Sequence, residues 1–356
     1  MRRGLPDGLA LLAALGFAAL APLPGCPTID DDDSAVGVDD DDASNDDDAS
    51  NDDDASNDDD ASNDDDASND DDASNDDDAS NDDDAADDDD SVGPCDALPL
   101  PASGTYSLSF DGETFDYVLH VPAGVSGADP LPLVLNFHGW LESGPGQQSR
   151  SGMDAAADAH GFAVAYPSSP TSSWNGGACC GTASATNRDD EGFARALVAA
   201  LSAQLCVDPQ RIYAAGFSNG GFLAHRLACE AGDLFAAVAP VSAMMTIEPS
   251  SCAGRLAPVV HLHGSFDAVV PIVGNALIDY PSLEDSTATW RTLHQCAATS
   301  TATSDTGYTC EEWVCADGAA VRECLLSGFG HDWPGSSSAL PANEEIWSFL
   351  SRFSLP

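Results

Sequence analysis

The sequence contains no lysine: its 11 basic residues are all arginine, and they face 61 aspartates and glutamates in a chain of 356 residues. Proteins that bind nucleic acid present a basic face to the phosphate backbone, so this shortage of positive charge argues against nucleic acid as a partner. The acidic excess is concentrated ahead of Cys95. From Cys95 onward, 9 arginines still face 27 acidic residues, a net charge of −18.

The sequence also lacks the paired C-x-x-C spacing of zinc sites, and we therefore expect no bound metal and no cofactor. The apolar run Leu9–Leu20 is too short and too rich in alanine for a membrane-spanning helix. Because it follows Met1-Arg2-Arg3, it is instead typical of a secretory signal, which predicts an exported protein.

Eleven cysteines are present, and Cys26 closes the leader. The other ten predict up to five disulfides in an exported domain. The adjacent pair Cys179 and Cys180 is too close along the chain for a relaxed disulfide, so we expect each to find a distant partner, or one to stay free. The ten are Cys95, Cys179, Cys180, Cys206, Cys229, Cys252, Cys296, Cys310, Cys315 and Cys324.

The leader ends in Leu23-Pro24-Gly25-Cys26, which resembles the lipobox of bacterial lipoproteins. That resemblance implies lipidation of Cys26 and tethering to the outer membrane, with Pro24 as a departure from the usual small residue. The alternatives are cleavage with free release, or an uncleaved anchor. Residues 1–26 are thus expected to be a signal peptide.

Seven copies of Ala-Ser-Asn-Asp-Asp-Asp run from Ala43 to Asp84. Alanine is the only apolar residue in each copy and like charges repel, so no core can form and we expect a disordered linker over residues 27–94. Weak Ca²⁺ binding is the alternative, although the D-x-D-x-D-G pattern of EF-hand loops is absent.

The remaining residues, 95–356, predict one α/β domain with a mostly parallel sheet and helices on both faces, because a strand pair is followed by alternating strands and helices. Apolar runs predict strands at 105–110, 115–121, 131–137, 162–166, 212–216, 236–241, 259–263 and 321–326. Helical patterns fall at 151–160, 189–205, 219–230, 282–294 and 343–353.

A G-x-S-x-G motif, Gly216 to Gly220, lies between an expected strand and an expected helix, the context of a nucleophile elbow. Ser218 is therefore the candidate nucleophile. Its hydroxyl needs a base, and in α/β-hydrolases the order along the chain is serine, acid, histidine.

Among the histidines after Ser218, His331 lies in a glycine-rich loop behind the last strand, so we assign it as the base. His261 and His263 lie on a strand and His294 closes a helix, where each has a structural explanation.

Asp267 follows the strand 259–263 and is the expected acid, which would stabilise the imidazolium. Asp279 and Asp285 are less favoured. The oxyanion hole is expected from the backbone N–H groups of Asn219 and Trp140, with Gly139 as the alternative to Trp140.

These residues together resemble the family of polyhydroxybutyrate depolymerases, feruloyl esterases and acetylxylan esterases. The resemblance implies an α/β-hydrolase fold, a Ser218–His331–Asp267 triad and hydrolysis of esters through an acyl-enzyme. It also implies a Cys229–Cys252 bridge. The motifs that carry it are Phe137-His138-Gly139, Trp174 to Gly181, Asp189 to Phe193, Gly216 to Gly221, His263-Gly264-x-x-Asp267 with Val270-Pro271, and Gly330-His331-x-Trp333-Pro334-Gly335.

Trp174, Trp333 and His138 are candidate substrate-binding residues, although each could equally serve to pack or order its loop. The favoured substrates are feruloyl or acetyl esters of plant cell-wall polysaccharide, followed by a polyhydroxyalkanoate polyester. A surface binding protein that keeps the fold without turnover is the remaining alternative. We expect a monomer.

Overall fold

The computed structural model describes Cys95 and residues 100–125, 129–275 and 280–356. The expected signal peptide with Cys26 and the acidic repeats lie outside these residues. In the part of the chain that is described, no helix has both the length and the apolar character needed to cross a membrane.

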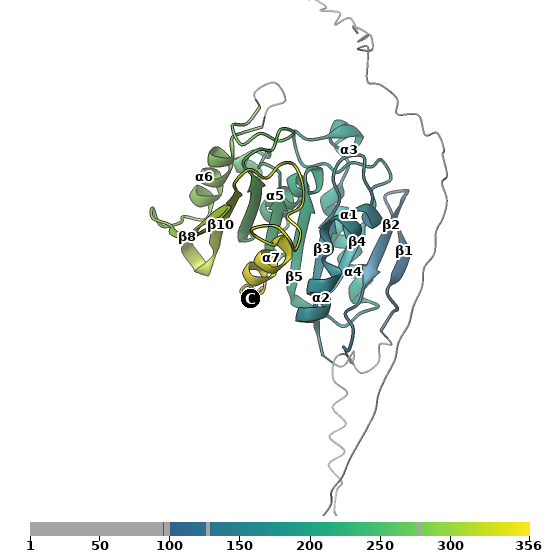
Figure 1. Cartoon of the computed structure of the whole chain (residues 1–356). Helices are drawn as coiled ribbons and strands as arrows, with labels where there is room; N and C mark the ends of the chain where they lie inside the picture. Colours follow the sequence, from purple (N-terminus) through teal and green to yellow (C-terminus); the bar gives the residue numbers. More distant parts are fainter. Residues whose placement is uncertain (1–94, 96–99, 126–128, 276–279) are drawn as a thin grey trace, which may run out of the picture. The chain divides into compact units, whose positions relative to one another are not determined.

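A ten-stranded sheet forms the centre of the domain, in the order β1-β2-β4-β3-β5-β6-β7-β10-β9-β8 (Figure 1). The six strands from β4 to β10 in this order pair in parallel, and an antiparallel pair flanks them on each edge. The strands are β1 (Gly104–Phe110), β2 (Glu113–His120), β3 (Leu131–Phe137), β4 (Ala163–Pro167), β5 (Val207–Phe217), β6 (Ala237–Val241), β7 (Val259–Gly264), β8 (Thr301–Asp305), β9 (Tyr308–Val314) and β10 (Ala320–Leu326).

Helices cover both faces of this sheet. Alternate side chains of β3 divide between two apolar layers: Leu133 and Leu135 join one, and Val134 joins the other. Helices α4, α5 and α6 pack in the first layer, and α2 and α7 in the second. The helices are α1 (Gly144–Ser151), α2 (Asp154–His160), α3 (Gly181–Ala185), α4 (Asp190–Ser202), α5 (Asn219–Glu230), α6 (Leu283–Leu293) and α7 (Ala342–Leu350). The predicted fold class is confirmed.

All eight predicted strands are present, but the pattern missed the hairpin of β8 and β9 and the helices α1 and α3. Every residue of β8 is exposed, so this edge strand carries no apolar alternation to detect. The helix expected over 151–160 begins only at Asp154, because Gly152 (φ 55°) ends α1 in the left-handed region.

The ten cysteines of the described residues form five disulfides, including the implied Cys229–Cys252 bridge. The prediction for Cys179 and Cys180 was wrong. They are bonded to each other, because the preferred Cα separation of relaxed disulfides does not by itself decide which cysteines pair. The other bridges are Cys95–Cys206, Cys296–Cys315 and Cys310–Cys324.

Candidate active site

The turn between β5 and α5 holds Ser218 in a backbone conformation (φ 51°, ψ −118°) that L-residues rarely adopt. The neighbouring glycines make this turn possible. A Cβ on Gly216 would overlap the Gly220 carbonyl, and one on Gly220 would overlap the Phe137 carbonyl of β3. The elbow therefore lies directly against the end of the adjacent strand, at the carboxyl edge of the sheet, where parallel sheets bind ligands.

His331 lies between Ser218 and Asp267 and contacts both. Its Nδ1 is 2.7 Å from Asp267 Oδ2, and its Nε2 is 3.0 Å from Ser218 Oγ. Because the carboxylate can only accept, Nδ1–H donates to it, and Nε2 is left to accept the serine proton. This is the arrangement that a serine nucleophile needs. The fold brings Ser218 and His331 together although they are 113 residues apart in the sequence.

Asp267 is buried in the turn that follows β7, and several donors surround its carboxylate. Oδ1 accepts the backbone N–H groups of Val269 (2.9 Å) and Val270 (2.7 Å), and His263 Nε2 lies 3.4 Å from Oδ2. Burial opposes ionisation, but the hydrogen bonds from His263, His331 and Val270 outweigh it and hold the pKa of Asp267 well below its ordinary value. The carboxylate is thus charged whenever His331 needs an anionic partner.

Two backbone N–H groups are the candidates for the oxyanion hole. Asn219 begins α5, where the first N–H groups of a helix have no partner within it. Within the described residues, Trp140 N–H makes no hydrogen bond, whereas Gly139 N–H donates to Glu142 Oε2 at 3.2 Å. The geometry therefore favours Trp140 over the alternative Gly139 as the second donor.

Arg150 joins the loop that follows β3 to the loop of His331, a connection that the sequence analysis missed. It donates to Glu142 on one side and to Asp332 on the other, and its guanidinium lies 4.6 Å from the centre of the Phe217 ring. No local pattern marks such a residue, because its two partners come from separate segments.

The three candidate substrate-binding side chains are buried, which favours the packing role that was their alternative. Trp174 has no exposed surface and stacks on Phe193, while Trp333 is 3% exposed and donates to Asn343. His138 is also buried, so none of the three can contact a bound ester.

His138 instead orders its loop, which is the structural alternative considered for it. Its Nδ1 donates to Gly139 O at 2.6 Å, and its Nε2 accepts from Ser169 N–H at 3.0 Å. Burial lowers the pKa of His138 to about 4, so the ring is neutral near pH 7.

The less favoured triad candidates have other surroundings. His261 is buried and hydrogen-bonded to His263. His294 follows the last residue of α6, and its ring is hydrogen-bonded to Ala257 O. Asp285 lies in the first turn of α6, and Asp279 is outside the described residues.

Exposed apolar side chains surround the triad. Trp140, a candidate for the oxyanion hole, is 52% exposed. Phe266 and Val269, which lie within two residues of Asp267 in the sequence, are 75% and 62% exposed. A cavity of about 700 Å³ lies elsewhere, at the amino ends of β7 and β10, and does not include the triad. The site therefore has exposed apolar residues near it.

The α/β-hydrolase class is defined by a serine in a strained turn after a strand, on a mostly parallel sheet between helices. That serine is hydrogen-bonded to a histidine, which is hydrogen-bonded to an acidic residue, as Ser218, His331 and Asp267 are here. Residues 115–301 match the family model described as Esterase PHB depolymerase, and the chain belongs to that family.

Known relatives agree with this assignment. The chain is 29% identical over 255 residues to Feruloyl esterase B of Piromyces equi, covering 67% of this chain and 45% of the relative. It is 32% identical over 250 residues to the putative esterase NocK of Nocardia uniformis subsp. tsuyamanensis, covering 64% and 72%. The chain thus spans less than half the length of Feruloyl esterase B.

A solved structure has the same fold. The acetyl xylan esterase from Aspergillus awamori superimposes with a TM-score of 0.53 at 17% identity, over 70% of this chain and 99% of the other.

Proposed function

We propose that the protein is an exported serine carboxylic ester hydrolase that acts through an acyl-enzyme. The observation that carries the proposal is the hydrogen-bonded line from Ser218 Oγ through His331 to Asp267. Ser218 attacks the ester carbonyl as His331 Nε2 takes its proton, and Asp267 stabilises the imidazolium. The N–H groups of Asn219 and Trp140 bind the oxyanion. His331 then protonates the leaving alcohol, and water releases the acid by the same steps.

Feruloyl or acetyl esters of plant cell-wall polysaccharide are the proposed substrates. Feruloyl esterase B and the bifunctional acetylxylan esterase/xylanase XynS20E of Neocallimastix patriciarum, named for these activities, are 29% and 27% identical to the chain. The exposed side chains of Trp140 and Phe266 suit an ester carried on a bulky polymer. The family description favours a polyhydroxybutyrate depolymerase as the second candidate.

Parallel assays on methyl ferulate, acetylated xylan and short hydroxybutyrate oligomers test these substrates. We expect methyl ferulate or acetylated xylan to be hydrolysed fastest and Ser218→Ala to lose the activity. Turnover of the oligomers alone would favour the second candidate. Full activity of Ser218→Ala would refute the mechanism.

We also propose the division into a signal peptide (1–26), an acidic linker (27–94) and an esterase domain (95–356), with lipidated Cys26 as an outer-membrane anchor. Detergent partitioning of a Cys26→Ser variant tests the anchor. Membrane association that survives this substitution would count against it.

A further inference from the structure

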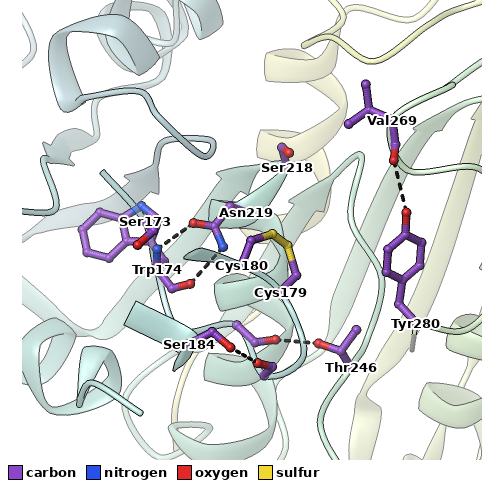
Figure 2. Close-up of a disulfide and its surroundings, with 12 residues drawn as sticks. Ser173, Trp174, Cys179, Cys180, Ser184, Ser218, Asn219, Thr246, Val269 and Tyr280 are labelled. Carbon is purple, nitrogen blue, oxygen red and sulfur yellow. Dashed lines mark hydrogen bonds between the residues drawn. A yellow bond between two sulfur atoms is a disulfide. The ribbon is translucent and has the colours of Figure 1, made fainter. Parts of the chain in front are cut away.

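The loop from Trp174 to Gly181 is fixed to the start of α5, immediately beside the nucleophile. The side chain of Asn219 accepts from Trp174 N–H at 2.6 Å and donates to Trp174 O at 2.9 Å (Figure 2). A Cβ on Gly176 would collide with Phe222 in the first turn of α5. The residue after Ser218 therefore sets the position of this loop.

Two further hydrogen bonds hold the loop from below. Thr246 donates to Gly176 O at 2.6 Å, and Ser184 donates to Gly177 O at 2.5 Å (Figure 2). These contacts place the Cys179–Cys180 disulfide beside Asn219 and leave both cysteines half-buried, with part of their surface facing solvent. A rigid, partly exposed disulfide thus lies at the nucleophile elbow.

The surroundings of the disulfide are apolar. Cys179 packs on a buried cluster that includes Phe222 and Tyr280. The Tyr280 hydroxyl donates to Val269 O at 3.1 Å, and Figure 2 shows these two residues across from Asn219, on the other side of the disulfide. The indole nitrogen of Trp140 lies against Gly181, at the end of the same loop.

His331, the proton-transfer residue, also lies beside Ser218. The His331 ring lies 4.9 Å from the Phe217 ring, and the Arg150 guanidinium lies over that same Phe217 ring. Because His331 protonates the leaving oxygen, the alcohol part of an ester lies beside the His331 ring. The acyl part is bonded to the same carbonyl carbon and points away from that oxygen, and Asn219, with the disulfide beside it, is a neighbour of Ser218 available to it (Figure 2).

We propose that the Cys179–Cys180 disulfide forms the wall of the acyl site and selects an aromatic acyl group. Sulfur is polarisable, and contacts between sulfur and aromatic rings are favourable. Both Val269, which accepts from Tyr280, and Trp140, which lies against Gly181, are exposed and close to the loop that carries the disulfide. This inference rests on the proposed esterase function and adds to it the residues that determine acyl preference.

The test compares 4-nitrophenyl ferulate with 4-nitrophenyl acetate, which share a leaving group and differ only in the acyl part. In a Cys179→Ser, Cys180→Ser variant we expect the ratio of kcat/KM for ferulate over acetate to fall by about tenfold, the discrimination that a few lost apolar contacts produce. A Cys179→Val, Cys180→Val variant, which restores an apolar surface without the bond, should recover part of the ratio.

The matched control is Cys310→Ala, Cys324→Ala, which removes a disulfide from the β9–β10 pair, away from the elbow, and should leave the ratio unchanged. If the serine pair does not fold, the valine pair is compared with an alanine pair, which removes surface without adding polar groups.

An unchanged ratio in the folded serine or alanine pair, or an equal fall for both esters, would overturn the inference. Either result would leave the proposed function intact, since that fails only if the wild-type protein hydrolyses neither ester or if Ser218→Ala remains active.

Discussion

The buried ring of His138 makes a prediction about stability in acid. Its Nδ1–H donates to Gly139 O, and its Nε2 accepts from Ser169 N–H. A protonated ring would carry a second N–H, which would face the Ser169 donor instead of accepting from it. Burial of the ring disfavours its charged form most of all, and the pKa of His138 is lowered from its ordinary value of 6.5 to about 4.

The sign of the effect follows from linkage. The unfolded chain takes up a proton near pH 6.5 that the folded chain refuses until about pH 4, so stability is lost as the pH falls through this window. Each pH unit below 6.5 costs at most about 1.4 kcal/mol for one such group, and the loss between pH 7 and pH 5 is about 2 kcal/mol.

Urea unfolding of the wild type and of His138→Gln, at a series of pH values with disulfides intact, measures this loss. Glutamine keeps a donor and an acceptor but does not titrate, so we expect its free energy of unfolding to fall by about 2 kcal/mol less than that of the wild type between pH 7 and pH 5. The control is His160→Gln, at the surface of α2, which should keep the steeper loss. Parallel pH profiles for the wild type and His138→Gln would refute the reasoning.

Three further predictions concern the site and its framework. Asp267→Asn should lower kcat by about 10⁴, because asparagine does not fix the Nδ1–H tautomer of His331, and steady-state kinetics against Ser218→Ala would measure it. A fall of less than tenfold would contradict the assigned role. Arg150→Gln should lower kcat about tenfold or more, by releasing the loops that Arg150 joins, and an unchanged kcat would count against that connection. Removing the bridge with Cys229→Ala, Cys252→Ala should cost about 3 kcal/mol for its 23-residue separation in denaturant unfolding, and a cost near zero would contradict the chain-entropy reasoning.

The hydrogen-bonded arrangement of Ser218, His331 and Asp267 could be predicted because each residue depends on short-range signals. Ser218 lies in a strand–turn–helix motif, and Asp267 and His331 follow strands in the order that the hydrolase fold requires. The substrate-binding residues could not be predicted in this way. Whether Trp174 is exposed depends on Phe193 and other rings from distant segments that cover it, and no local pattern records that packing.

The cysteine pairing shows the same limit. The even number of cysteines was informative about the total, but the partner of each cysteine depends on how its loop folds, and spacing along the chain does not record that. The hairpin of β8 and β9 was missed for another reason. Strand β8 is polar and exposed throughout, so its hydrogen bonds to β9 define it and its side chains do not.

The Cys95–Cys206 bridge decides how the domain would bear a mechanical load. Cys206 immediately precedes β5, and Ser218 immediately follows it. The disulfide to Cys95 and the nucleophile therefore lie at opposite ends of one strand. Val207 pairs with Leu131 and Gly216 with Phe137, across a bulge in β5, so the strand spans the length of the seven-residue β3, roughly 23 Å at about 3.3 Å per residue. A pull on the chain that precedes Cys95 would pass through this bridge into the start of the central strand, at the end of β5 opposite Ser218.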